Sequence, residues 1–349
     1  MGREREYNLD LLRILASFMV VFLHVAAQNW DTIPPASAPW QIFNIYDILV
    51  RSAVPIFFML SGKLFLSRND VSLKKLFSKN ILRFVFIYFL WSFLYSIDQI
   101  GIKTLLSSPD LNLLFTTFVS SKYHLWYLPA LVSIYFIIPV FIAMKSYKNG
   151  KILDYTAILF IAFAIIKYSI TLIPMNQSFL ELIRKFNFEL DGFCGYFILG
   201  YVLDKHKEKL KKIPTFALII FFLVTAALTA WGSSVLSVKS GIATAMLYDY
   251  FFIATFIEAV IIFALFLRMS QFNFNKTAET IIRKLSSYTL FVYLFHPFVL
   301  QHLSIWFGLN SLSFNAVLSV PFLAVLIFIL CVAVAIILDK IPFIRKIFL

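Results

Sequence analysis

Ten stretches of mainly apolar residues dominate this chain, and they decide what it can fold into. A helix needs about 20 such residues to cross the hydrocarbon core of a bilayer. The 349 residues are 61% hydrophobic, with a mean hydropathy of +0.86, whereas soluble domains are about 45–50% apolar. We therefore predict an all-α integral membrane protein with about ten transmembrane helices, approximately at 9–28, 43–66, 81–100, 124–144, 152–172, 188–203, 213–232, 246–267, 286–305 and 315–338.

The segments between these stretches are short, and they carry most of the charge. With a cytoplasmic N-terminus, 22 Lys and Arg residues fall in the inner segments and five in the outer segments. This asymmetry follows the positive-inside rule and places both termini in the cytoplasm. It also accounts for the net charge of +13 without nucleic acid, which we do not expect as a partner. We expect one membrane domain over residues 1–349 and a multi-pass location in the cell membrane.

Several kinds of chemistry have no support in the sequence. Cys194 and Cys331 are the only cysteines and lie far apart, so neither a disulfide framework nor a metal site is predicted. The chain has no P-loop, no GxSxG nucleophile elbow, no HExxH pair and no dense acidic cluster. We expect no metal cofactor.

The first apolar stretch, "LDLLRILASFMVVFLHVAAQ", carries ionisable residues that are costly in a bilayer. In a helix, a turn of 100° per residue puts its polar side chains on one narrow face: Asp10, Arg13, Ser17, His24 and Gln28. Arg13 and His24 are eleven residues apart and hence ~16 Å apart along that face. Asp10 and Arg13 can pair at headgroup level, with His24 as a packing residue. The depth of His24 favours a functional role instead.

Other predicted spans carry polar groups too. Arg51 lies in the middle region of the second, followed by Ser61 and by Lys63, which can extend to the inner surface. Glu258 lies near the membrane centre and needs a partner or a proton; Arg51 is a candidate by depth. The remaining polar and aromatic candidates lie in the fourth and ninth spans: His124, Trp126, Tyr293 and His296.

Depth separates these residues into two groups. Basic residues gather at or near the inner surface, namely Arg13, Lys63, Lys79 and Arg83, and imidazoles in the outer half, namely His24, His124, His296 and His302. A cytoplasmic donor with an anionic head and a long uncharged arm fits this layout, as acyl-coenzyme A does. A histidine can take a proton from a sugar hydroxyl near neutral pH. The polar stripe is therefore interpreted as a reaction path through the membrane.

These residues resemble a known family. "LDLLRILASFMVVFLH" is similar to the first-helix signature of the membrane-bound acyltransferase family 3. Four further segments resemble that family's later motifs in order: "VPIFFMLSGKLFL", "YHLWYLPALVSIYFIIPV", "GYFILGYVL" and "LSSYTLFVYLFHPFVL". By length the chain resembles the stand-alone members.

The resemblance implies a ten-helix domain of a bacterial inner membrane. It implies transfer of an acyl group from cytoplasmic acyl-coenzyme A, usually acetyl-coenzyme A, to a hydroxyl of an envelope polysaccharide or lipid-linked sugar. It makes His24 catalytic and Arg13 essential beside it. Lys79 and Arg83 are the nearest match to a basic pair of the family, with altered spacing. We expect substrate-binding roles for Asp10, Arg51, Ser61, Lys63, Lys79, Arg83, His124, Trp126, Glu258, Tyr293 and His296.

Two alternatives remain at this point. Ten spans with interrupted helices and buried charges also suit a transporter or flippase for a lipid-linked sugar or an amino acid. The second alternative is a membrane protein that binds an amino acid for a cytoplasmic partner enzyme. For the enzyme, both direct transfer and an acyl-histidine at His24 are open. The sequence predicts neither the acceptor, nor the acyl chain, nor an oligomeric state.

Overall fold

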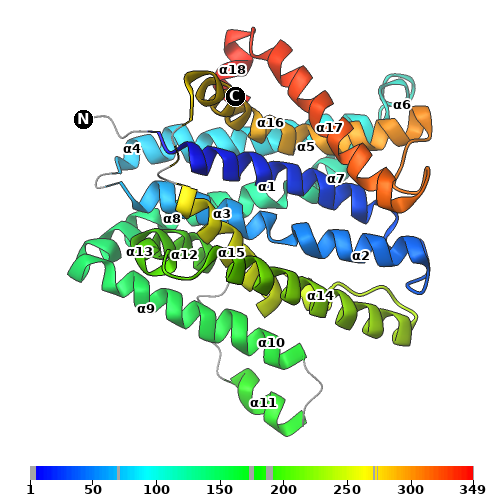
Figure 1. Cartoon of the computed structure of the whole chain (residues 1–349). Helices are drawn as coiled ribbons and strands as arrows, with labels where there is room; N and C mark the ends of the chain where they lie inside the picture. The colour runs from blue at the N-terminus through cyan, green and yellow to red at the C-terminus, as the bar shows by residue number, and fades with distance from the viewer. Residues whose placement is uncertain are drawn as a thin grey trace.

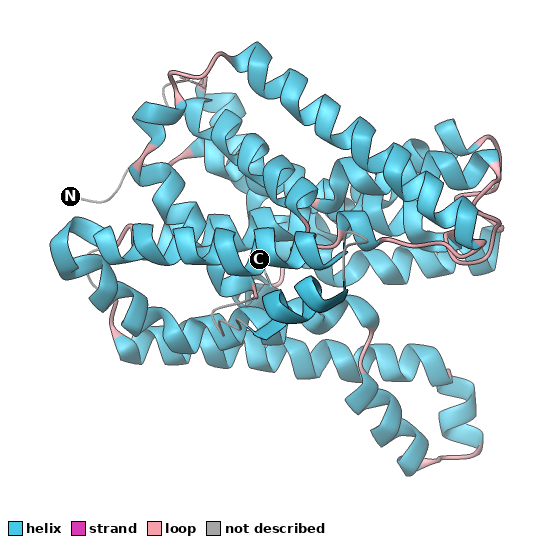
Figure 2. Ribbon diagram, turned by 90° about the horizontal axis from the view of Figure 1, so that it is seen from below, coloured by secondary structure: helices cyan, strands magenta, loops and turns pink. Residues whose placement is uncertain are grey.

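The structure, a computed structural model, describes residues 5–68, 71–172, 177–185, 192–269, 272 and 274–348. Helices joined by loops make up these residues, and no strand occurs among them (Figures 1 and 2). The helices are α1 Tyr7–Ala26, α2 Ala38–Arg51, α3 Ala53–Leu66, α4 Leu73–Lys75, α5 Leu82–Ile100, α6 Ile102–Ser107, α7 Leu111–Ser120, α8 Tyr127–Ser146, α9 Lys151–Phe160, α10 Lys167–Leu172, α11 Gln177–Lys185, α12 Phe193–Lys205, α13 Lys207–Leu210, α14 Thr215–Ser240, α15 Ile253–Arg268, α16 Lys276–Phe307, α17 Ala316–Leu338 and α18 Pro342–Phe348. The π-helical turns Leu76–Ile81 (η2) and Ile161–Ile166 (η5) and four 3₁₀ turns complete the described helical elements: Ala27–Asn29 (η1), Tyr123–Trp126 (η3), Tyr147–Gly150 (η4) and Met246–Tyr248 (η6).

Within the described ranges, eight helical segments are long and apolar enough to cross a membrane: Tyr7–Asn29, Ala38–Leu66, Leu73–Ile100, Tyr123–Leu172, Thr215–Ser240, Met246–Arg268, Lys276–Phe307 and Ala316–Leu338. The segment Tyr123–Leu172 is two spans, because Lys148 and Asn149 have positive φ and break it between α8 and α9. The helix α12 corresponds to the short sixth span; residues 188–191 of that prediction lie outside the described residues. The all-α membrane fold is confirmed.

The second span is broken where the sequence places a proline. Pro55 has no N–H, and its ring clashes with the carbonyl four residues earlier, at Arg51. The helix α2 accordingly ends at Arg51, and α3 begins at Ala53 after a turn at Ser52. Arg51 therefore lies at a helix end inside the bundle, between two half-length helices.

The helices α3 and α12 cross at very short range in the core. A Cβ atom on Gly62 would lie 1.6 Å from the carbonyl oxygen of Phe197, and one on Gly200 would lie 1.9 Å from the carbonyl oxygen of Met59. Only glycine allows two backbones to approach this closely, as at small-residue interfaces of membrane helices. The short α12 is thereby held tightly against α3.

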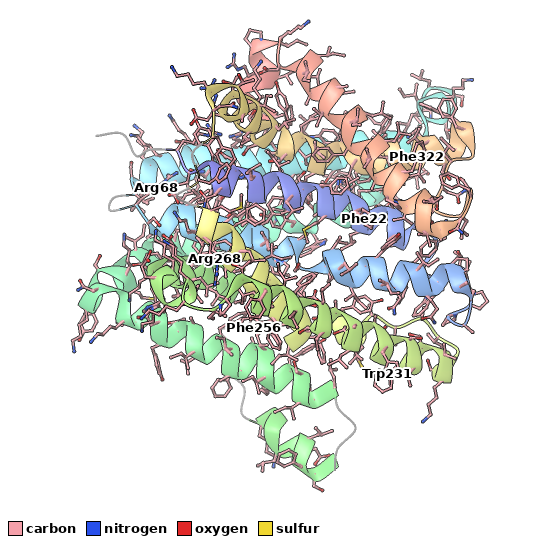
Figure 3. All side chains as sticks on the ribbon, in the orientation of Figure 1. Phe22, Arg68, Trp231, Phe256, Arg268 and Phe322 are labelled. Carbon is pink, nitrogen blue, oxygen red and sulfur yellow. The ribbon has the colours of Figure 1, made fainter. Side chains whose placement is uncertain are left out.

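The helix α1 lies in the middle of the molecule, where it contacts α2, α3, α15, α16 and α17 (Figure 1). Large apolar side chains on the peripheral helices, such as Trp231 of α14 and Phe322 of α17, are exposed (Figure 3). An exposed apolar surface of this kind suits contact with lipid. The polar stripe of α1 is thus surrounded by protein.

Candidate active site

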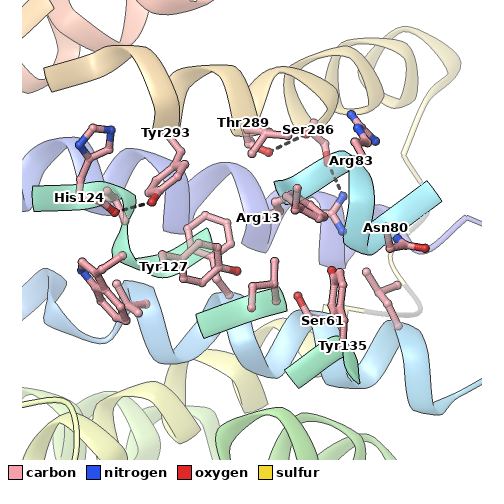
Figure 4. A pocket seen from close by; sticks show the side chains of 18 of the residues that line it. Arg13, Ser61, Asn80, Arg83, His124, Tyr127, Tyr135, Ser286, Thr289 and Tyr293 are labelled. Atoms are coloured by element: carbon pink, nitrogen blue, oxygen red, sulfur yellow. Dashed lines mark hydrogen bonds between the residues drawn. The ribbon is translucent and has the colours of Figure 1, made fainter. Parts of the chain in front are cut away.

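A cavity of about 380 Å³ runs beside α1 (Figure 4). This volume is within the range of small-molecule sites, about 300–1,000 Å³. The lining residues with polar groups come from α1, α3 and the turn after it, the η2–α5 segment, the η3–α8 segment, α16 and the segment before α15: Arg13, His24, Ser61, Arg68, Asn80, Arg83, His124, Trp126, Tyr127, Tyr135, Tyr250, Ser286, Ser287, Thr289 and Tyr293. Apolar side chains such as Val20, Leu23, Val54 and Phe57 fill the rest of the wall.

Two histidines from distant helices meet at one end of this cavity. Nδ1 of His24 lies 2.9 Å from Nε2 of His296, and Nδ1 of His296 lies 3.0 Å from the carbonyl oxygen of Val292. A carbonyl only accepts, so in a neutral ring Nδ1 of His296 carries the hydrogen and Nε2 accepts one from His24. His24 then keeps its hydrogen on Nδ1 and has a free lone pair on Nε2. His296 is fully buried behind His24 and does not line the cavity.

His124 and Trp126 enter from the turn η3, which precedes α8. The His124 ring lies 5.6 Å from the His296 ring, and the backbone carbonyl of His124 accepts a hydrogen bond from the Tyr293 hydroxyl (Figure 4). Both ring nitrogens of His124 are buried without a hydrogen-bond partner among the described residues. Trp126 lines the cavity with 39% of its surface exposed. At the His24 end of the cavity, the ring nitrogens of His124 are thus available to a ligand beside the ring of Trp126.

Arg13 lies farther along the cavity, toward the inner end. Its guanidinium donates to Ser286 Oγ at 3.2 Å and to Asp10 at 3.4 Å. Asp10 also accepts from Arg5 Nε at 2.6 Å and from Ser286 Oγ at 2.7 Å. Asp10 is buried and does not line the cavity, so its carboxylate orients Arg13 from behind. The Asp10–Arg13 pair expected from their spacing is present.

Three more polar side chains line the inner end: Arg68, Asn80 and Arg83. Arg83 Nε donates to the carbonyl of Ile347 in α18, at 2.8 Å. Lys79, which the sequence paired with Arg83, is exposed and lies outside the cavity lining, on the π-helical turn η2. Arg68 contributes a cation here instead. Arg68 follows the predicted second span almost directly, and this position could have indicated a cation at the inner end of the cavity.

Lys63 is placed differently from the expectation that it extends to the surface. Its side chain is 1% exposed and pairs with Glu6 and with Asp204, the latter at 3.6 Å. It therefore connects α3 to the start of the chain and to α12 and does not line the cavity. A buried cation needs acidic partners. Here Glu6, before α1, and Asp204, near the end of α12, provide them.

The expected pairing of Glu258 with Arg51 is wrong. Arg51 pairs with Asp47, one turn earlier on α2, and its guanidinium lies 5.1 Å and 5.8 Å from the ring centres of Tyr248 and Tyr250. Glu258 is 1% exposed, and its Oε1 has no hydrogen-bond partner among the described residues. Neither residue lines the cavity beside α1. Similar depth in the membrane suggested Glu258 as the partner of Arg51, but Asp47 in the same helix, α2, lies nearer to Arg51.

The cavity therefore brings together seven of the residues singled out in the sequence: Arg13, His24, Ser61, Arg83, His124, Trp126 and Tyr293. Sequence reasoning missed Tyr127, Tyr135 and Ser286, although Tyr127 follows Trp126 directly and Ser286 stands in the segment "LSSYTLF". No group of three or more His, Cys, Asp or Glu side chains in the described ranges is arranged to hold a metal ion.

A family model described as an acyltransferase domain matches residues 6–338. No curated protein and no solved structure matches the chain. The matched range includes every cavity-lining residue from Arg13 to Tyr293.

Proposed function

The chain belongs to the membrane-bound acyltransferase family 3, whose domain model it matches over residues 6–338, and on this premise we propose a donor, an acceptor and a catalytic base. It is a multi-pass membrane protein that transfers acyl groups other than aminoacyl groups. The proposed donor is cytoplasmic acetyl-coenzyme A. The proposed acceptor is a hydroxyl of an envelope glycan or lipid-linked sugar, in a bacterial inner membrane.

One observation carries this proposal: a single cavity has cations at one end and a histidine with a free Nε2 lone pair at the other. Arg13, Arg68 and Arg83 line the inner end, which the positive-inside rule places at the cytoplasm. A helical rise over eleven residues separates Arg13 from His24 by ~16 Å. The donor phosphates would bind the arginines, and the uncharged arm would extend along the cavity toward His24.

The chemistry then follows from the histidine pair. His24 Nε2 takes the proton of the acceptor hydroxyl while the hydroxyl oxygen attacks the thioester carbonyl. A C–O bond forms, the C–S bond breaks, and the proton passes to the departing coenzyme A thiolate. His296 accepts the Nδ1 hydrogen of His24 and holds the ring in the tautomer that this step requires, as the orienting group of a catalytic triad does. An acyl group carried briefly on His24 is the two-step variant.

The proposal is tested with purified protein in nanodiscs, acetyl-coenzyme A labelled in its acetyl group, and an envelope glycan extract. We expect label to enter the glycan fraction only when the protein is present. The transporter alternative predicts that unmodified glycan crosses the membrane of proteoliposomes when no acetyl-coenzyme A is present. Transport without label incorporation would refute the proposed donor and acceptor together.

A further inference from the structure

A second cavity, of about 290 Å³, lies beside the first and has a different lining. Eight residues line it: Arg51, Tyr168, Thr244, Ala245, Met246, Tyr248, Asp249 and Tyr250. All of these except Ala245 and Met246 have polar side chains, and all except Arg51 and Tyr168 belong to one connecting segment. This segment, residues 241–252, joins the outer end of α14 to the start of α15. The proposed function does not use this cavity.

The connecting segment folds back into the bundle instead of crossing its surface. The amide of Thr244 donates to Ser237 Oγ, and the carbonyl of Thr244 accepts from Ser233 Oγ, both at 3.1 Å. Ser233 lies two turns before the end of α14, which is ~10 Å back along the helix, and Figure 1 shows the segment returning beside α14. Irregular backbone at membrane depth occurs only where protein buries it or a water-filled cavity adjoins it. The fold-back thus places polar side chains of this segment around the second cavity, inside the bundle.

The two cavities share one wall residue, Tyr250. Its carbonyl accepts the Tyr196 hydroxyl at 2.5 Å, which fixes the backbone, and its ring lies 5.8 Å from the ring of Trp126. Trp126 and His124 line the first cavity at the end that holds His24. A ligand in the second cavity is therefore separated from the reacting end of the first by one aromatic side chain.

The charges of the second cavity select against an anion. Its lining holds one cation, Arg51, and one anion, Asp249, and Arg51 is already paired with Asp47. Arg51 lies against the rings of Tyr248 and Tyr250, and its Nε has no hydrogen-bond partner among the described residues. Aromatic faces with hydrogen-bonding groups between them, and no surplus positive charge, match an uncharged sugar ring more closely than a phosphate or a uronic acid.

The geometry points to the second cavity as part of the acceptor site: it binds one uncharged pyranose of the glycan, while the reacting hydroxyl lies on the other side of Tyr250, in the first cavity beside His24. This inference rests on the proposed function and adds the place and the charge class of the acceptor. It assigns Arg51 and Tyr248 to acceptor binding, apart from the donor cavity.

Cysteine protection tests binding without catalysis. Thr244→Cys lines the second cavity, and Lys239→Cys is an exposed control on the end of α14; both are made with Cys194 and Cys331 replaced by alanine, in nanodiscs free of glycoside detergent. The rate of N-ethylmaleimide labelling is measured with methyl glucoside, galactoside or mannoside, and with methyl glucuronide. By mass action, at least one neutral glycoside should slow labelling at position 244 by about threefold or more once it exceeds its Kd twofold. Methyl glucuronide should not slow labelling at position 244. Labelling at position 239 should be unaffected by the neutral glycosides and by the glucuronide.

Failure of protection by all three neutral glycosides, or equal protection by the glucuronide, would overturn the inference. A second readout separates it from the proposed function. Maleimide attached at position 244 should abolish glycan-dependent transfer and leave acetyl-coenzyme A binding unchanged. Unchanged transfer after complete labelling would refute the acceptor site while the proposed function stands. Protection by a neutral glycoside without any acetyl transfer, even by unlabelled protein, would establish sugar binding and refute the proposed function.

Discussion

His24 of α1 and His296 of α16, which are 272 positions apart in sequence, share one hydrogen bond of 2.9 Å between Nδ1 and Nε2. The Val292 carbonyl behind His296 sets the direction of that bond. The result is a defined tautomer of His24, with its free nitrogen available as a base. His296 therefore acts on the reaction by positioning His24.

The positioning role predicts a graded response at His296. His296→Ala removes the His296 acceptor for the Nδ1 hydrogen of His24 and should lower kcat by roughly tenfold or more. The loss should not exceed the roughly 10²–10⁴-fold that a general base contributes as a whole. His296→Gln, whose amide oxygen can accept that hydrogen, should restore part of the loss. The KM for acetyl-coenzyme A should not change. A KM effect with unchanged kcat would contradict the positioning role.

The cations at the inner end should govern donor affinity. Arg68→Gln should raise the KM for acetyl-coenzyme A by roughly three- to tenfold, because a charged contact to phosphate is lost. The effect should shrink as salt is added. Lys75→Gln, an exposed change in the same cytoplasmic segment outside the cavity lining, is the matched control. Equal KM values for the two variants across a salt series would refute phosphate binding at Arg68.

The crossing of α3 and α12 predicts a stability effect. Gly200→Ala would place a methyl group 1.9 Å from the Met59 carbonyl oxygen, and the helices must separate to admit it. Overpacking of this kind costs about 1–3 kcal/mol or more. Gly232→Ala meets only the end of the Leu247 side chain and should be tolerated. Thermal unfolding in detergent compares the two, and equal midpoints would show that the backbones are not in contact.

The buried ion pairs of Lys63 predict a larger loss than a surface pair does. Lys63→Ala removes both pairs and a fully buried side chain, while Asp204 keeps its pair with Lys207, so we expect a loss of about 1–3 kcal/mol. Lys211→Ala removes an exposed pair with Glu208, which is worth about 0–1 kcal/mol. Thermal unfolding should therefore separate the two variants clearly. A Lys63→Ala protein as stable as Lys211→Ala would contradict the structural assignment.

Sequence patterns predicted the membrane fold because bilayer thickness sets span length directly. Helical periodicity likewise predicted that Asp10, Arg13 and His24 share a face, because it depends on local geometry alone. Both inferences use properties of one segment at a time.

The remaining features depend on packing between segments. Similar depth suggested that Arg51 pairs with Glu258, but Arg51 pairs with Asp47 of its own helix, α2. Lys79 and Arg68 both stand in a basic inner segment, and only the course of the chain through η2 decides which lines the cavity. The fold-back of residues 241–252 has no periodic signal, so the second cavity was not predicted.

The central claim is that His24 is the base of an acetyl-coenzyme A-dependent transfer. Its most direct measurement is coenzyme A release by purified protein, with and without envelope glycan extract, for wild type and His24→Ala. His302→Ala, which alters a histidine paired with Asp98 outside the cavity, is the control. We predict glycan-dependent release by wild type and His302→Ala, and a rate lower by roughly 10²-fold or more for His24→Ala. Release by correctly folded His24→Ala protein at the wild-type rate would contradict the account.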